Sequence, residues 1–227
     1  MKKYLIVVAH PDDEVMGAGA TIKKFTENGD AVDLCIMSTQ AQARATDVGV
    51  DELFGDLENC SKFLGVNQIF KGTFPNIEMN TVTHLALVQF IEKAISESNP
   101  DIIITHHSSD VNNDHYQTFI ACQAAIRLFQ RRDNIKPIEE VWLMEVLSST
   151  DWSIDPMSEK FTPNIFVEIG DKYLSSKLKA LDMYRGVLRD YPHPRSEKGL
   201  TGLAIYRGGQ VGLDYAEAFD CVFRRIK

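Results

Sequence analysis

The chain lacks three features that would place it in familiar classes. Its cysteines are far apart and form no CxxC pair, which argues against a thiolate metal site or a disulfide framework; they are Cys35, Cys60, Cys122 and Cys221. No apolar run approaches the ~20 residues that a membrane-spanning helix needs. Basic residues are in the minority, since 32 Asp and Glu against 24 Lys and Arg leave a formal net charge of −8. Nucleic-acid binding is therefore disfavoured, because no excess of basic residues is present to neutralise a phosphate backbone.

The overall composition of the chain is that of a globular protein. The chain has 227 residues, of which 44% are hydrophobic, so we expect residues 1–227 to form a single domain with a sizeable core. The N-terminal MKKYLIVVAH reaches a histidine and acids too soon for a secretory signal, and unpaired cysteines suit a reducing compartment. These features predict a cytoplasmic protein without an integral membrane segment that acts on a small neutral or cationic molecule. A homo-oligomer is compatible with the sequence.

Runs of β-branched residues alternate with amphipathic segments along the chain, a pattern typical of parallel strands joined by crossover helices. The runs predict strands at 3–9, 32–38, 67–70, 101–106, 139–146 and 164–169. The segments between them predict helices at 13–28, 50–64, 81–98, 114–131 and 171–188. Long polar loops are expected at 149–163 and 191–202. The fold class is therefore predicted to be α/β, a three-layer Rossmann-like fold with a mostly parallel sheet.

The first concentration of polar residues is HPDDE, from His10 to Glu14, at the end of the first predicted strand. Ligands bind at the carboxyl edge of a parallel sheet, so these side chains are placed for function. Acids in the first turn of a helix also stabilise its positive end, which explains one or two of them but not the adjacent histidine. Gly17 and Gly19 suggest a nucleotide loop, but Ile22 replaces its third glycine and the acids would repel a pyrophosphate. A nucleotide site is therefore disfavoured.

A second polar cluster, HHSSDVNNDH, ends the fourth predicted strand and contains His106, His107, Asp110, Asp114 and His115. Any one of these histidines alone would more often be a packing or capping residue. Together with His10 and Asp13 from the first strand end, however, His115 makes a set of two histidines and one carboxylate, which suits a divalent metal with open positions. Imidazole ligands suit Zn²⁺, and Fe²⁺ would satisfy the same side chains. We therefore expect one metal ion per chain, able to activate a water molecule.

The motifs AHPDDEVMGAGATI and HHSSDVNNDH together resemble the zinc-dependent de-N-acetylase family that includes N-acetylglucosaminyl-phosphatidylinositol deacetylase (PIG-L) and the LmbE-like proteins. Later segments, EVLSSTDW, YPHPRS and GLDYAEAF, resemble its bacterial saccharide-associated branch. The resemblance implies that His10, Asp13 and His115 bind Zn²⁺ and that Asp12 is the general base of amide hydrolysis. Asp114 would either orient a histidine ligand or simply begin a helix, and both interpretations stay open.

The chain departs from the family pattern near the last metal ligand. Several members carry a histidine three residues before that ligand, where this chain has Asn112. An amide can bind substrate or an oxyanion by donating a hydrogen bond, but it cannot deliver a proton. Protonation of the leaving amine then falls to Asp12, returning its proton, or to His193, which two prolines hold on a stiff segment. The alternative for His193 is a histidine in a surface turn.

A second departure concerns substrate binding. Many members carry an arginine on the helix that ends in LGV, at the position of Leu53 in this chain. Arg44 on the preceding loop, or Arg195 and Arg207 near the C-terminus, would have to supply the cationic contact, and each could equally be a solvated or ion-paired side chain. The identity of the substrate is affected more than the type of reaction.

The expected function is removal of the N-acetyl group from an N-acetylglucosamine-type amino sugar, within a saccharide or sugar conjugate. Two alternatives remain, namely a metal-binding accessory protein without turnover and an amidase for a non-sugar N-acyl metabolite. The presence of Asp12 favours an enzyme over the accessory protein, because metal binding alone does not require it.

Overall fold

The computed structural model describes residues 1–40 and 50–226, which are arranged around a seven-stranded sheet with the order β3-β2-β1-β4-β5-β7-β6. The strands are β1 (Lys3–Val8), β2 (Ala31–Ile36), β3 (Gln68–Lys71), β4 (Ile102–His106), β5 (Glu140–Met144), β6 (Ile165–Glu168) and β7 (Ala216–Arg224). The helices are α1 (Asp13–Glu27), α2 (Val50–Leu64), α3 (His84–Ser98), α4 (Asn113–Ala125), α5 (Gly170–Asp182) and α6 (Glu197–Gly209), with short 3₁₀ turns η1 (Met79–Thr81), η2 (Leu128–Gln130) and η3 (Thr150–Trp152). Strands β1 to β5 run parallel, whereas β7 pairs antiparallel with both β5 and β6.

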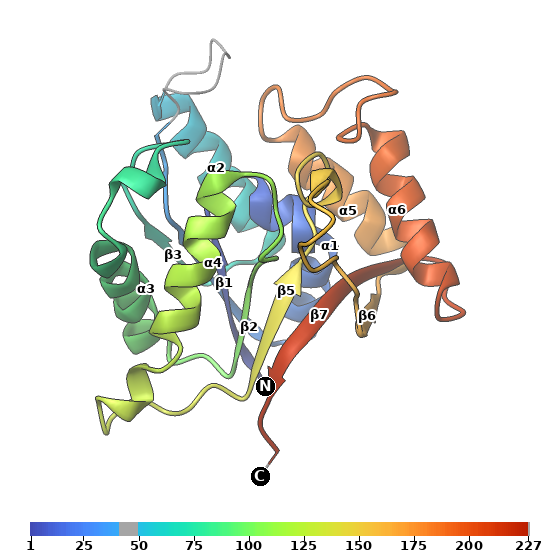
Figure 1. Cartoon of the computed structure of the whole chain (residues 1–227). Coiled ribbons are helices and arrows are strands. Elements are labelled where there is room, and N and C mark those ends of the chain that lie inside the picture. The colour runs from blue at the N-terminus through green and yellow to red at the C-terminus, as the bar shows by residue number, and fades with distance from the viewer. Residues whose placement is uncertain (41–49, 227) are drawn as a thin grey trace.

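Helices cover both faces of the sheet (Figure 1). On one face, alternate residues of the central strands such as Ile6 and Ile104 pack with α1, α2 and α5. On the other face, Leu5 and Ile103 pack with α3 and α4. Strands covered on both faces become continuously apolar, which explains the sequence YLIVV in β1. The arrangement confirms the predicted three-layer α/β fold.

The six predicted strands all form, and each boundary lies within two residues of its prediction. Helix α3 begins at His84 rather than 81, and two other helices end well before their predicted positions. Helix α4 ends at Ala125 rather than 131, because the chain turns there and brings Leu128 into the core beneath α3 and α4. Helix α5 ends at Asp182 rather than 188, and Gly186 beyond it has a φ of 74°, which a right-handed helix does not allow.

The prediction of a loop over 191–202 is wrong in its second half, because α6 begins at Glu197. Ser196 caps this helix, its hydroxyl accepting a hydrogen bond from the backbone N–H of Gly199. Four glycines lower the helix propensity of the segment and obscure it in the sequence; they are Gly199, Gly202, Gly208 and Gly209. Strand β7 was not predicted either, and it inserts between β5 and β6.

Gly17 lets α1 lie close to β5. A Cβ atom at this position would lie 2.4 Å from Sδ of Met144, so only glycine fits without displacement of the methionine. The GxG of this segment therefore reflects helix packing, in agreement with the rejection of a nucleotide loop. Among the residues that the structure describes, none of the helices has both the length and the apolar character required to cross a lipid bilayer.

Candidate metal centre and active site

The polar clusters of the sequence meet at the carboxyl ends of β1 and β4, the two strands at which the sheet order reverses. His10 and Asp13 lie at the junction of β1 and α1, while His115 lies in the first turn of α4, beyond the end of β4. Neighbouring parallel strands with crossovers in opposite directions leave a crevice at this point, which is where open α/β sheets bind ligands. The fold therefore brings together side chains about a hundred positions apart in the chain.

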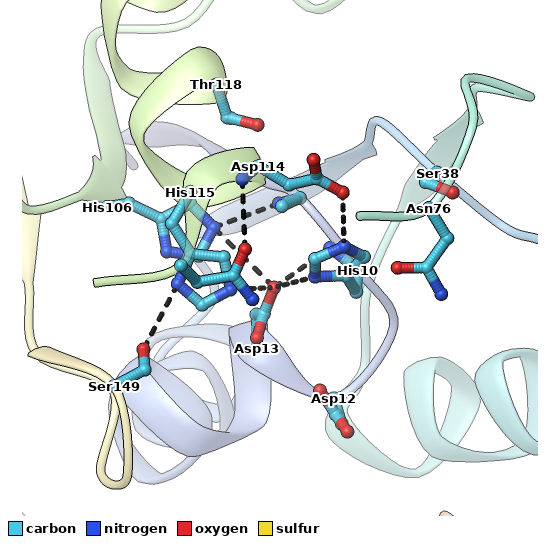
Figure 2. Close-up of polar contacts among 12 residues, drawn as sticks. His10, Asp12, Asp13, Ser38, Asn76, His106, Asp114, His115, Thr118 and Ser149 are labelled. Carbon is cyan, nitrogen blue, oxygen red and sulfur yellow. Dashed lines mark hydrogen bonds and ion pairs between the residues drawn. The ribbon is translucent and has the colours of Figure 1, made fainter. Parts of the chain in front are cut away.

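His10, Asp13 and His115 form a buried group whose ligand atoms all lie within 4.8 Å of one another. Oδ2 of Asp13 lies 3.3 Å from Nδ1 of His10 and 3.2 Å from Nε2 of His115. Figure 2 shows the two imidazoles on either side of the Asp13 carboxylate. Two nitrogens and one carboxylate oxygen at this spacing could hold a divalent metal ion.

The second ring nitrogen of each histidine is held by another carboxylate. Nε2 of His10 lies 2.9 Å from Oδ2 of Asp114, and Nδ1 of His115 lies 2.9 Å from Oδ2 of Asp110. A histidine that donates its outer N–H to a carboxylate keeps the inner nitrogen unprotonated and directed inward, as is common for metal-binding histidines. The donor set thus fits a metal ion. The role left open for Asp114 is now specified, since its partner is His10 rather than His115.

Both outer carboxylates are fixed by further donors. Asp114 accepts backbone N–H bonds from Ile77 at 2.6 Å and Met79 at 3.0 Å, so it also anchors the segment that follows β3. Ile77 has a φ of 66°, a strained value for a β-branched residue that this anchoring maintains. Asp110 accepts bonds from the hydroxyls of Ser149 and Thr150, at 2.7 and 2.8 Å. Sequence reasoning did not assign these roles, which depend on loops meeting in space.

A second group, His106, Asp110 and His115, also has ligand atoms close enough for a metal, but its geometry is less suitable. The rings of His106 and His115 stack face to face, with centroids 3.9 Å apart and planes 14° from parallel. Nitrogen lone pairs lie in the ring plane, so two stacked rings cannot direct them at one ion between them. Nε2 of His106 also accepts the backbone N–H of Ala9 at 2.9 Å. We therefore assign His106 to packing behind the first group.

Buried charges in the first group favour a cation. Burial alone lowers the pKa of His115, but the carboxylates of Asp13 and Asp110 outweigh it and raise this pKa to about 10. Burial likewise opposes ionisation of Asp13, yet His115 and His10 hold the pKa of its carboxyl well below the usual range. The carboxylates thus stabilise positive charge here, carried either by protons on the histidines or by a metal ion that replaces them.

Asp12 sits at the start of α1 in a left-handed conformation, with φ of 97°. Its backbone N–H donates to Oε2 of Glu14 at 3.1 Å, and Oε1 of Glu14 accepts the Tyr184 hydroxyl at 2.6 Å. Burial raises the pKa of Glu14 to about 8, opposed by the Tyr184 hydrogen bond and assisted by the charge of Asp12. Figure 2 shows the Asp12 side chain beside the metal-binding group, not within it. The strained turn therefore places the carboxylate of Asp13 in the group and the carboxylate of Asp12 at its edge.

Of the remaining predicted residues, Arg195 reaches the site, since its Nη1 lies 3.7 Å from Oδ2 of Asp12. Asn112 caps α4, its Oδ1 accepting the backbone N–H of Asp114 at 2.9 Å. His193 is exposed, and its Nδ1 accepts the backbone N–H of Arg195 at 3.0 Å. Arg44 lies outside the described residues. The structure thus brings Arg195 to Asp12, and the roles predicted for the other three residues stay predictions.

Arg207 and Asp56, which lies on the predicted helix that ends in LGV, also have defined partners. Arg207 pairs with Glu145, with Nε 2.7 Å from Oε1, so it is ion-paired as its alternative interpretation anticipated. On α2, Asp56 accepts bonds from the guanidinium of Arg185, with Nη2 3.0 Å from Oδ1. A cation therefore reaches α2 from the end of α5.

The chain is similar along its whole length to proteins of known and differing activities. It is 26% identical over 237 residues to the diacetylchitobiose deacetylase of Thermococcus kodakarensis, a match covering 98% of this chain and 84% of the relative. The solved N,N'-diacetylchitobiose deacetylase of Pyrococcus horikoshii superimposes with a TM-score of 0.78 at 21% identity, covering 97% of this chain and 84% of that one. The 4-carboxy-2-hydroxymuconate hydratase GalB of Pseudomonas putida KT2440 superimposes equally well, with a TM-score of 0.79 at 19% identity and coverage of 100% and 98%.

Because a deacetylase and a hydratase share this architecture, the two superpositions establish the fold alone. Family membership comes from the sequence. The family model for GlcNAc-PI de-N-acetylase (PIG-L) matches residues 5–126, more than half of the chain, including both polar motifs of the candidate metal centre. The chain therefore belongs to the PIG-L family of de-N-acetylases.

Proposed function

We propose that the protein is a metal-dependent hydrolase that removes the N-acetyl group from an N-acetylglucosamine-type amino sugar within a saccharide or sugar conjugate. The observation that carries the proposal is the buried group of His10, Asp13 and His115 with Asp12 at its edge. Family membership supports de-N-acetylation, and the chitobiose-specific name of one relative supports a sugar substrate.

In this proposal His10, Asp13 and His115 hold one divalent ion, for which Zn²⁺ is the first choice and Fe²⁺ the second. The ion would supply an activated water molecule and polarise the acetyl carbonyl. Asp114 and Asp110 hold the two imidazoles in the orientation that binding requires. The His10 and His115 rings are not stacked, with planes 47° apart, so their lone pairs can converge.

Asp12 is assigned as the general base. Its carboxylate takes a proton from the attacking water as the water oxygen bonds to the carbonyl carbon. The C–N bond then breaks, the proton passes to the leaving nitrogen, and acetate and the free amine are released. We assign this return of the proton to Asp12 in the first instance and to His193 as the second candidate, because Nε2 of His193 makes no hydrogen bond with a described residue.

Arg195 is assigned to substrate binding near the reacting amide. Its Nε donates to Oγ of Ser148 at 2.7 Å, which holds the guanidinium beside Asp12. Asn112 is assigned a second contact, through the amide N–H₂ that its capping role does not use. Arg44 is proposed as a third from its sequence position alone. The cytoplasmic location and homo-oligomer formation remain predictions from the sequence.

The alternatives make different predictions about metal and turnover. An accessory metal-binding protein would bind the ion without releasing acetate, and an amidase for a non-sugar N-acyl metabolite would bind the ion but leave N-acetyl sugars uncleaved. The decisive measurement combines metal analysis with acetate release from N-acetylglucosamine and N,N'-diacetylchitobiose. It compares the wild type with His115→Ala and with His84→Ala, a matched substitution at an exposed histidine at the start of α3.

We expect about one metal ion per chain and acetate release in the wild type and in His84→Ala, with both lost in His115→Ala. Bound metal without acetate release from either sugar would reject the sugar deacetylase assignment. Full metal content in His115→Ala would reject the proposed ligand set.

A further inference from the structure

A groove of about 870 Å³ lies between the segment after α5 and the first turns of α6. Its walls include Arg189, Asp190 and Tyr191 on one side and Glu197 and Lys198 on the other. The volume falls within the range of about 300–1,000 Å³ that small-molecule sites occupy. None of these residues belongs to the metal-binding group or to its hydrogen-bonded carboxylates.

The groove and the candidate active site are linked by the short segment between α5 and α6, which carries residues of both. Arg195 points into the site, with Nη1 3.7 Å from Oδ2 of Asp12. The carbonyl oxygen of the same residue accepts the backbone N–H of Arg189 at 3.2 Å, and Arg189 lines the groove. Figure 1 shows this α5–α6 segment at the end of the sheet where the candidate site lies. A ligand bound beside Asp12 and Arg195 would therefore lie next to the segment that lines the groove.

The side chains of the groove match the chemistry of a sugar ring. Tyr191 is 67% exposed, and Nζ of Lys198 lies 4.9 Å from its ring centroid, so the aromatic ring is held in place yet accessible. The side chains of Arg189, Asp190 and Glu197 make no hydrogen bond or ion pair with another described residue. A sugar presents an apolar C–H face for the aromatic ring and hydroxyls that both donate to carboxylates and accept from a guanidinium.

Other ligand classes fit the groove less well. A phosphate group would meet the carboxylates of Asp190 and Glu197 as well as the cations of Arg189 and Lys198, so the groove offers it no net positive charge. An acyl chain would remove water from four charged side chains without replacing the hydrogen bonds that they make with it. We infer that the groove binds the saccharide unit next to the acetylated sugar, with Tyr191 as its stacking platform. This inference rests on the proposed function, since it assigns the second unit of the same substrate.

The test compares the metal-loaded wild type with Tyr191→Ala, Tyr191→Phe and Tyr206→Ala. Tyr206 is a matched control, because it lies on α6 and is 59% exposed but does not line the groove. Binding of N-acetylglucosamine and of N,N'-diacetylchitobiose is measured by isothermal titration calorimetry, and kcat/KM is measured for both sugars. In the wild type the disaccharide should bind more tightly than the monosaccharide. Tyr191→Ala should reduce the ratio of the two affinities about tenfold, whereas Tyr191→Phe and Tyr206→Ala should leave this ratio unchanged.

Two results would overturn the inference. One is a wild type that binds both sugars equally, and the other is an equal loss for both sugars in Tyr191→Ala, as expected if the residue only supports Arg195. Failure of the proposed function gives a different result, since no acetate would be released from either sugar while calorimetry would still report whether the disaccharide is preferred.

Discussion

His10 and Asp114 are joined by a buried contact of 2.9 Å between Nε2 and Oδ2, which links the end of β1 to the first turn of α4. The same oxygen of Asp114 accepts the backbone N–H of Ile77 at 2.6 Å. One carboxylate thus fixes the orientation of a proposed metal ligand and the loop after β3 together. An acid placed only to begin a helix would have neither partner.

Asp114→Asn should therefore weaken metal binding. The amide keeps the shape of the carboxylate but loses its charge, so it holds the Nε2–H of His10 less strongly and the imidazole less rigidly. We expect the Kd of the metal to rise about 10- to 100-fold, as measured by competition with a chromophoric chelator. Asp171→Asn, at an exposed acid in the first turn of α5, is the matched control and should leave the Kd unchanged. Similar Kd values for the two variants would mean that Asp114 serves only the start of the helix.

Asp12→Asn should separate catalysis from metal binding. Asparagine tolerates the left-handed conformation of this position, so the turn at φ of 97° should be retained. The amide cannot accept a proton, and we expect kcat for acetate release to fall about 10²- to 10⁴-fold with the metal content unchanged. A variant with activity within a few-fold of the wild type would remove Asp12 from the role of general base.

Gly17→Ala should destabilise the protein through the packing of α1 on β5. The added methyl group would meet Sδ of Met144 at 2.4 Å in a fully buried position. We expect a loss of about 1–3 kcal/mol in the free energy of unfolding, measured by urea denaturation. Gly55→Ala is the matched control in α2, where an added Cβ would have no neighbour within 4 Å, and it should be neutral or stabilising by up to about 1 kcal/mol. Equal effects at the two sites would mean that α1 can shift away from the sheet.

The sequence was sufficient to predict that the polar clusters after β1 and β4 would lie close together, because strand ends in a parallel sheet meet at one edge whatever the details of packing. To predict that His10, Asp13 and His115 lie close together, only β1 and β4 had to be assigned correctly. Which carboxylate would hold which histidine depends on how α4 and its neighbouring loops face after folding. The pairing of Asp114 with His10, and of Asp110 with His115, could therefore not be read from spacing.

Long-range packing also explains why the contacts of α1 with β7 and α5 could not be predicted. Glu217 of β7 accepts the backbone N–H groups of Ala20 and Thr21 within this helix, at 3.2 and 2.7 Å. Lys177 of α5 donates to the carbonyl of Met16 and to Glu217, both at 2.7 Å. A buried ion pair thus bridges the carbonyl and N–H groups of the helix carrying Asp12 and Asp13. Neither member could be identified in the sequence, because β7 was not predicted and local patterns carry no information about such contacts.

The stability of the metal-free protein should depend on pH through His107. Burial lowers the pKa of this histidine below its ordinary value, with the carboxylates of Asp220, Glu159 and Asp110 opposing the shift. Between pH of about 6.5 and the lower folded-state pKa, the unfolded chain binds a proton at this position that the folded protein does not. The free energy of unfolding should therefore fall on acidification through this interval, and His107 should contribute less than about 1.4 kcal/mol per pH unit to that fall.

The variant His107→Asn tests this contribution, because it removes the titrating group while its side-chain oxygen can still accept the backbone N–H of Ser109. The free energy of unfolding is measured by urea denaturation in the presence of a chelator, from pH 7.5 to 5.5. It should decline less steeply in the variant than in the wild type. Parallel declines for the two proteins would contradict the assignment.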